Sequence, residues 1–283
     1  MDRTGLLIWH FLDKRLSLRF ALVSSKVDKA SSLMAQVLIK EYGFKESGNF
    51  QNSQIFLRNE DALVFSGKDV LQMNDVDFSP EAYIFLSRHA SQSGTPTITS
   101  HFPGNVGEDT SHGGKARELA WTYPSLQKCF MQSVWKLKDE ARPYDVIVES
   151  THHGPTSLKR PVLFVELGST EKEWTDLHGA SVLCKALSAT LDNFNKAKKI
   201  GIGLGGLHYS EKFTKLLVEG DAALAGFISK YNLPNVREDT IDSLINKSCE
   251  KITVAYLDWK GLGQEKQRII KILERENLNV IKL

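Results

Sequence analysis

Glu149-Ser150-Thr151-His152-His153-Gly154-Pro155-Thr156 is the stretch from which the fold of this chain is best predicted. The residues before it, 144–148, are apolar at successive rather than alternate interior positions, which is typical of a strand covered on both faces. Helices must then flank the sheet, so we expect an α/β fold. Gly154-Pro155 ends the strand and puts both histidines on the turn at its carboxyl end, the edge at which open α/β sheets bind ligands.

The composition is that of a soluble globular enzyme. The 283 residues are 41% hydrophobic and 25% charged, and the net charge of +2 gives no overall field that demands a nucleic acid partner. Cys129, Cys184 and Cys249 lack any CxxC spacing and are interpreted as buried thiols of a reducing compartment. No apolar run approaches the roughly 20 residues that span a bilayer. We therefore expect a cytoplasmic protein without a membrane anchor, acting as a monomer.

Strand-like and helix-like patterns alternate along the chain from residue 18. Thr170-Glu171-Lys172-Glu173 has the pattern of a capping box, which predicts a helix start. Alternation of this kind predicts a three-layer α/β/α sandwich with a mostly parallel or mixed sheet. We assign residues 1–17 to an N-terminal extension and residues 18–283 to a single α/β domain. The predicted strands are 18–23, 55–57, 62–65, 82–86, 96–101, 144–149, 162–167, 199–204, 252–257 and 279–281, and the predicted helices are 28–42, 125–141, 170–194, 238–248 and 262–276.

Residues 104–117, by contrast, are rich in glycine and polar side chains and show no period. An aperiodic segment of that length is usually a lid or a binding loop. We interpret it as a mobile loop.

Five of the eight histidines follow predicted strands. If those strands are parallel neighbours, their carboxyl ends bring the imidazoles to one edge of the sheet, and neutral imidazole is the commonest protein ligand for zinc. His152 and His153 are adjacent, so in an extended chain they would point to opposite faces. Either the turn redirects one of them or the two have different functions. The five are His89, His101, His152, His153 and His208.

Two carboxylates, Glu149 and Glu166, lie at the ends of strongly apolar strands. An unpaired charge is costly in such a place, so each needs a metal or a histidine beside it. An ion pair with Arg88 or Lys159 is the alternative.

The glycine-rich stretch 201–206 matches GxGxxG, but the acidic residue that a dinucleotide fold needs on the next strand is missing. We therefore predict no dinucleotide. We interpret Gly205 and Gly206 as bare backbone that a substrate approaches closely, flanked by His208 and Tyr209.

The order and spacing of six motifs resemble the archaeal and plant type of D-aminoacyl-tRNA deacylase from about residue 18 to the end of the chain. The motifs are Lys26-Val27-Asp28-Lys29-Ala30-Ser31, Ser87-Arg88-His89, Thr151-His152-His153-Gly154-Pro155-Thr156, Glu166-Leu167-Gly168-Ser169-Thr170-Glu171-Lys172-Glu173-Trp174, Gly203-Leu204-Gly205-Gly206-Leu207-His208-Tyr209 and Asp258-Trp259-Lys260-Gly261. The resemblance implies hydrolysis of the ester between a D-amino acid and the terminal ribose of tRNA. It also implies two zinc ions per chain and a phosphorylase/hydrolase-like fold.

Combining the resemblance with the residue patterns gives one hypothesis for the site. Catalytic roles are expected for His152, His153 and Glu149, and metal ligation for His89, His152, Glu166 and His208. The acceptor end of D-aminoacyl-tRNA is expected to contact His101, Thr156, Gly205, Gly206, Tyr209 and Lys26. Loop amides at Gly154 or at Gly205 and Gly206 are expected to hold the oxyanion of the tetrahedral intermediate.

Three other functions fit the sequence. The same kind of scaffold also hosts zinc-dependent peptidases or amidases and nucleoside phosphorylases, because fold does not fix function. A tRNA-binding protein without catalysis, whose histidines contact the acceptor end, is the alternative from another class.

Overall fold

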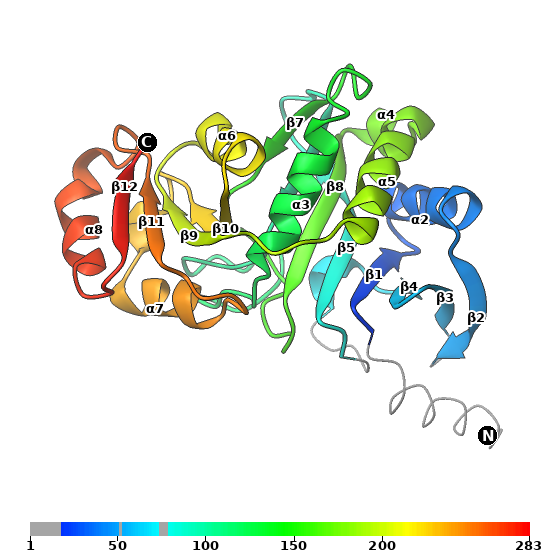
Figure 1. Ribbon diagram of the computed structural model, residues 1–283, viewed down its shortest axis with the longest axis horizontal. Helices are drawn as coiled ribbons and strands as arrows, with labels where there is room; N and C mark the ends of the chain where they lie inside the picture. Colours follow the sequence, from blue (N-terminus) through cyan, green and yellow to red (C-terminus); the bar gives the residue numbers. More distant parts are fainter. Residues whose placement is uncertain (1–17, 51–52, 74–78) are drawn as a thin grey trace.

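The structure, a computed structural model, describes residues 18–50, 53–73 and 79–283 (Figure 1). The predicted N-terminal extension lies outside these residues. Two β-sheets lie side by side along the length of the molecule, one built from residues 20–169 and the other from residues 199–282. No helix in the described ranges has both the length and the apolar character that crossing a membrane requires.

The larger sheet has eight strands and is mixed. Its central strands β4, β1, β5 and β8 run parallel, β2 and β3 add an antiparallel hairpin edge, and β6 runs antiparallel to β8. In sheet order the strands are β2 (Lys45–Phe50), β3 (Ser53–Arg58), β4 (Asp61–Ser66), β1 (Phe20–Ser25), β5 (Ala82–Ala90), β8 (Val162–Ser169), β6 (Thr97–His101) and β7 (Asp145–Val148).

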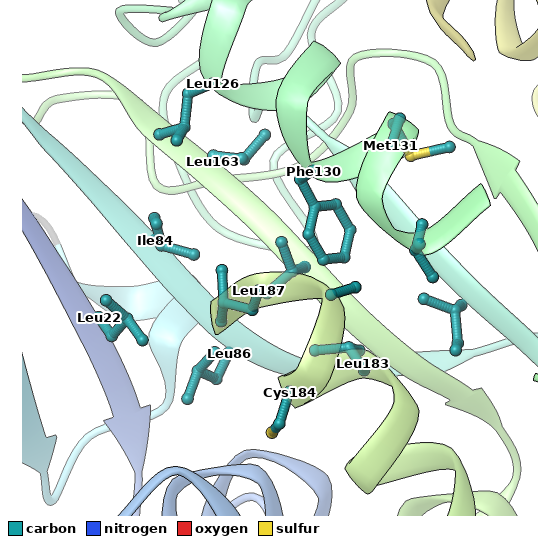
Figure 2. Packing of buried hydrophobic residues seen from close by; sticks show 14 of the residues in the cluster. Leu22, Ile84, Leu86, Leu126, Phe130, Met131, Leu163, Leu183, Cys184 and Leu187 are labelled. Carbon is teal, nitrogen blue, oxygen red and sulfur yellow. The ribbon is translucent and has the colours of Figure 1, made fainter. Parts of the chain in front are cut away.

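Helices cover one face of this sheet. They are α2 (Lys29–Glu41), α3 (Pro124–Trp135) and α5 (Leu177–Asp192). Figure 2 shows Phe130 of α3 and Leu187 of α5 packed over strand residues such as Ile84 and Leu163, all of them buried. The apolar stripes of these helices therefore form the main core.

The opposite face of the same sheet is covered differently. Its apolar cluster contains Phe85 and Phe164 and is closed by Val70, on the 3₁₀ turn η1 (Val70–Gln72), and by Leu158. Side chains two residues apart on a strand share a face, so Ser87 and His89 of β5 and Glu166 of β8 continue this face beyond Phe85 and Phe164. The polar side chains thus lie on the face opposite the helices α2, α3 and α5.

The smaller sheet is entirely parallel and shows the predicted three layers. Its strands are β10 (Ala222–Ile228), β9 (Lys199–Leu204), β11 (Val254–Leu257) and β12 (Asn279–Lys282). Phe213 of α6 (Glu211–Glu219) packs in the cluster on one face, together with β10. Helices α7 (Glu238–Asn246) and α8 (Lys266–Leu273) contribute Ile241 and Ile269 to the cluster on the other. The predicted α/β class is confirmed.

The two sheets are joined along residues 149–151, which we call the seam. Glu149 forms an isolated antiparallel bridge with Tyr209. The Ser150 N–H donates to His208 O at 2.9 Å and the Thr151 N–H to Phe227 O at 2.8 Å. The turn that carries the adjacent histidines is therefore held by both sheets.

Several element predictions are confirmed and several are wrong. Asp28 caps α2 by accepting from the Ser31 N–H, as expected. The helix predicted over 170–194 is two helices, because the capping box opens only the short α4 (Glu171–Trp174) and Asp176 then caps α5. Helix α3 ends at Trp135 rather than at 141, and strands β2 and β10 were not predicted.

Candidate metal centre

Seven ionisable side chains converge at the seam, on the face of the larger sheet opposite its helices. Five are the histidines singled out from the sequence and two are the strand-end carboxylates. Their potential ligand atoms form three overlapping groups within the described residues, and in each group these atoms lie within 4.8 Å of one another. The groups are His101, His152 and His153; Glu149, His152 and His208; and His89, Glu149 and Glu166.

The convergence is as predicted, but the reason given for it is wrong. His89 lies within β5 rather than after it, and it points from the face of the sheet. His101 ends a strand that runs antiparallel to β8, so it lies beside Phe164 near the opposite end of that strand from Gly168. The imidazoles meet because they project from one face of the larger sheet and because the seam crosses that face. They do not meet at a common carboxyl edge of parallel strands.

His89 is bound by two carboxylates. Its Nδ1 lies 3.2 Å from Glu149 Oε1 and 3.3 Å from Glu166 Oε2, and its Nε2 lies 3.1 Å from the Tyr209 hydroxyl. Burial opposes protonation of this imidazole, but the two anions outweigh it and raise the pKa of His89 to about 10. Burial raises the pKa of Glu166, but the neighbouring imidazoles of His101 and His89 outweigh it and lower that pKa to about 2.

His152 and His153 both turn into the centre, although they are adjacent in sequence. His153 has a left-handed φ of 42°, which changes the direction of the chain between the two side chains. Their ring centroids are 4.3 Å apart. Nδ1 of His152 lies 2.8 Å from Ser150 O and Nδ1 of His153 lies 2.6 Å from Gly154 O. Carbonyl oxygens only accept, so each Nδ1 carries the proton and each Nε2 presents a lone pair.

The lowered pKa values of His152 and His153 also favour neutral rings. Burial lowers the pKa of His152 well below its usual range, and neighbouring imidazoles lower it further. Burial, with the nearby His101, lowers the pKa of His153 to about 4. Neutral imidazoles with a free Nε2 are suited to binding a metal.

His101 was expected to contact substrate, yet it is fully buried. Its ring stacks on Phe164 at a centroid distance of 4.9 Å and lies 4.1 Å from the ring of His152. Within the described ranges neither of its ring nitrogens has a hydrogen-bond partner, and Nε2 is 3.5 Å from Glu166 Oε1. Its position fits metal ligation with His152 and His153, rather than the substrate contact assigned to it from the sequence.

His208 completes the centre from the smaller sheet. Its Nε2 lies 3.0 Å from Glu149 Oε2, and its Nδ1 lies 2.9 Å from the hydroxyl of Ser150. The Tyr209 ring contacts both His208 and His89, with centroid distances of 4.8 and 5.6 Å. The sequence predicted no role for Ser150. Its hydroxyl contacts a histidine 58 residues away, and no local sequence pattern indicates such a contact.

The other predicted substrate residues lie outside the cluster of ligands. Thr156 is buried, and its hydroxyl donates to Glu118 and accepts from the Lys115 N–H. Lys26 is exposed and lines a small cavity of about 340 Å³ with Trp174. The Trp174 indole N–H donates to His89 O at 2.7 Å, so that cavity adjoins the strand carrying His89.

The amides proposed for the oxyanion are largely occupied. The Gly154 N–H donates to His112 O and the Gly205 N–H to Ile228 O. Gly205 and Gly206 have φ of +94° and +80°, and a Cβ on either would meet residues 258 to 261 or Ser210. Close packing of the smaller sheet's own loops therefore requires glycine at both positions. Substrate contact at Gly205 and Gly206 stays a prediction.

Residues 104–117 pack against the turn that carries His152 and His153. Asn105 Nδ2 donates to Gly113 O and Lys115 O, and the His112 carbonyl accepts from the Gly154 N–H. A Cβ on Gly114 would lie 3.1 Å from the Gly154 Cα. The hydrogen bonds tie this segment to the turn, in contrast to the mobile loop expected from its composition.

The residues present fit a metal. The buried His101 ring with unpaired nitrogens, carboxylates on the same face and Nδ1 protons fixed by carbonyls on two further histidines are the arrangement that divalent zinc sites use. The exposed fractions of the His152 and His208 side chains, 27% and 32%, leave the centre open on one side.

Known proteins resemble this chain along most of its length. The sequence profile described as D-aminoacyl-tRNA deacylase matches residues 76–281. The chain belongs to the D-aminoacyl-tRNA deacylase family. The D-aminoacyl-tRNA deacylase of Pyrococcus horikoshii is 34% identical over 267 residues, covering 90% of this chain and 96% of the relative. That of Cenarchaeum symbiosum is 32% identical over 262 residues, covering 92% and 98%. The resemblance inferred from the motifs is confirmed.

A solved structure confirms the fold of this deacylase family member. The crystal structure of a conserved protein of unknown function superimposes with a TM-score of 0.85 at 24% identity, covering 93% of this chain and 95% of the other. Together with family membership, this supports one architecture along nearly all of the chain.

Proposed function

We propose that this chain hydrolyses the ester that joins a D-amino acid to the terminal ribose of tRNA, and so recycles mischarged tRNA. One observation carries the proposal: five imidazoles and two carboxylates meet in three ligand groups in a member of the D-aminoacyl-tRNA deacylase family. A centre of this kind could activate water for attack on the carbonyl carbon of an ester. We propose that the partner is the acceptor end of the tRNA and that the protein acts as a cytoplasmic monomer.

Zinc is the proposed metal, with two ions per chain. His101, His152 and His153 would hold one ion, and His89, Glu149 and Glu166 would hold the other, because these two groups share no residue. His208 belongs to the remaining group, which shares His152 with the first set and Glu149 with the second, so we propose it as a further ligand where the two sets meet. A zinc ion in such a site supplies Lewis acidity, which polarises a carbonyl group and makes water a stronger acid.

We propose that a side chain of this protein, and not a bound metal, transfers the proton of the attacking water. Glu149 is buried beside three imidazoles, and its pKa is held well below the usual range by hydrogen bonds from His208 and His89, which outweigh burial. We propose that Oε1 of this carboxylate stays with the His89 and Glu166 group, while Oε2, on the His208 side, accepts the proton of the attacking water and returns it to the ribose oxygen as the ester C–O bond breaks. The neutral His152 and His153 are better suited to hold metal than to donate protons. Tyr209, through its hydroxyl on His89 Nε2, would fix that ring.

The test is deacylation of D- and L-aminoacyl-tRNA by the full chain, with and without a chelator. We expect turnover of the D substrate only, lost on chelation and restored by zinc. His152→Ala and His153→Ala should each reduce the rate at least 100-fold, because each removes a proposed ligand. His178→Ala is the control, since that exposed ring contacts Arg142 O instead of the centre.

Full activity in both His152→Ala and His153→Ala would reject the proposed centre. Turnover of a peptide, an amide or a nucleoside in place of the ester would favour the peptidase, amidase or phosphorylase alternatives. Tight tRNA binding without bound metal or turnover would favour a non-catalytic tRNA-binding protein.

A further inference from the structure

We propose that Ser150 is a positioning residue, which sets the ring orientation of His208 through its hydroxyl and both the ring orientation and the tautomer of His152 through its carbonyl. The inference deepens the proposed function and rests on it for its catalytic consequence. The contacts of Ser150 and their effect on zinc affinity can be tested without any tRNA substrate. Ser150 itself belongs to none of the ligand groups.

Three atoms of this one residue contact the two histidines. The Ser150 N–H donates to His208 O at 2.9 Å. Its Oγ lies 2.9 Å from His208 Nδ1. Its carbonyl oxygen accepts from His152 Nδ1 at 2.8 Å. Backbone and ring of His208 are thus both bound to Ser150, while His152 is bound two residues further along the same segment.

The hydroxyl suits His208 because it can donate or accept a hydrogen bond. With the Nε2 proton directed at Glu149, the hydroxyl donates to Nδ1. When Nε2 offers its lone pair to a metal, the Nδ1 proton is donated to the hydroxyl. The contact is therefore kept in both states, whereas a carboxylate in its place would accept only. Orienting groups of this kind typically change metal affinity by roughly 10–100-fold when removed.

The surroundings of Ser150 make the contact rigid. Ser150 has no exposed surface, and the residues on either side of it are fixed by the Glu149–Tyr209 bridge and by the hydrogen bond from Thr151 to Phe227. The hydroxyl cannot exchange its partner for water without moving the seam.

The test is Ser150→Ala in the full chain, with two readouts that do not need substrate. The first is ¹⁵N NMR of the histidine rings in the metal-free protein. We expect the nitrogen signals of His208 to change, because its ring loses the partner at Nδ1, and those of His152 to stay, because its carbonyl partner is retained. The second is affinity for Zn²⁺ itself, measured by competition with a chromogenic chelator. We expect it to fall by roughly 10–100-fold.

Ser188→Ala is the matched control. It removes the hydroxyl of another buried serine, on α5, outside the three ligand groups. A general effect of losing a buried hydroxyl would appear in both variants, whereas the zinc affinity should fall only in Ser150→Ala. Ser150→Thr, which keeps a hydroxyl, should restore the wild-type His208 signals.

Unchanged His208 signals and unchanged zinc affinity in Ser150→Ala would overturn the inference. Both readouts are independent of deacylation. If the wild-type chain binds zinc but fails to cleave D-aminoacyl-tRNA, the proposed function fails while the role of Ser150 still stands or falls on its own measurements.

Discussion

His89 and His153 belong to the same centre, yet their pKa values move in opposite directions. His89 faces two carboxylates, which raise its pKa to about 10, while desolvation and the neighbouring His101 lower the pKa of His153 to about 4. At neutral pH, the metal-free centre therefore holds a protonated His89 between two anions and a neutral His153 with a free Nε2.

These shifts predict a stability optimum for the metal-free protein near pH 6.5. The depressed pKa of His153 means that the unfolded chain binds more protons between about 6.5 and 4, so stability falls as the pH drops through that range. The raised pKa of His89 gives a contribution that is complete below 6.5 and is lost as the pH rises towards 10. At roughly 1.4 kcal/mol per pKa unit, the acid limb should amount to about 3 kcal/mol and the alkaline limb to about 5 kcal/mol. Urea unfolding of chelated protein from pH 4 to 10 measures both.

His153→Asn separates the two limbs. Asparagine tolerates the left-handed φ of 42° at this position and does not titrate in this range. The loss of stability below pH 6.5 should become shallower, while the loss above pH 6.5 should remain. An acid limb of unchanged depth would show that His153 is not responsible for it.

At the scale of elements, the pairing of β5 with β8 sets the place of His89. Gly168 lies opposite His89 in this parallel pair. A Cβ at Gly168 would lie 2.2 Å from His89 O and 2.7 Å from His89 Cβ. A side chain is therefore excluded there, because the strand that carries His89 passes too closely.

Gly168→Ala should accordingly displace His89 and weaken the centre. We expect a loss of about 1–3 kcal/mol in the free energy of unfolding, as for overpacked sites, with a reduced zinc content after dialysis. Gly67→Ala is the control, because nothing lies within 4 Å of a Cβ at that position. Chemical denaturation and elemental analysis of both variants decide the matter. Equal stability and equal zinc content in the two would contradict this account of β5.

The sequence predicted elements well where the signal was local. Asp28 could be recognised as a cap and 162–167 as a buried strand from neighbouring residues alone. Strand β10 was missed because alanine and glycine, which favour strands poorly, fill much of it. The direction of β6 could not be predicted, since it depends on a partner more than 60 residues away. That direction also decides that His101 is buried in the centre instead of facing a substrate.

At the scale of the whole molecule, the two sheets share one core. Leu224 and Phe227 of β10 lie in the same apolar cluster as Phe130 of α3 and Leu22 of β1. Helix α3 contacts both sheets, packing against β10 of the smaller sheet and against β6 and β7 of the larger. The sheets are therefore joined by apolar burial in addition to the hydrogen bonds of the seam.

A shared core predicts that residues 18–283 unfold as one unit, as expected of a single domain. Far-UV circular dichroism and the intrinsic tryptophan fluorescence should give one coincident transition in guanidinium chloride. Tryptophans in both halves, Trp135 and Trp259, make fluorescence sensitive to each sheet. Two separate transitions, or midpoints that differ between the probes, would mean that the sheets are independent domains.

The centre lies on the face of the larger sheet away from its helices, and this position affects which substitutions the protein can accept. The main core of the larger sheet lies under α2, α3 and α5, whereas His89 and Glu166 project from the other side. Residues bordering the centre can consequently be exchanged during evolution or engineering without repacking the helices behind the strands. New specificities should arise here by altering the rim of the open face, at little expense to folding.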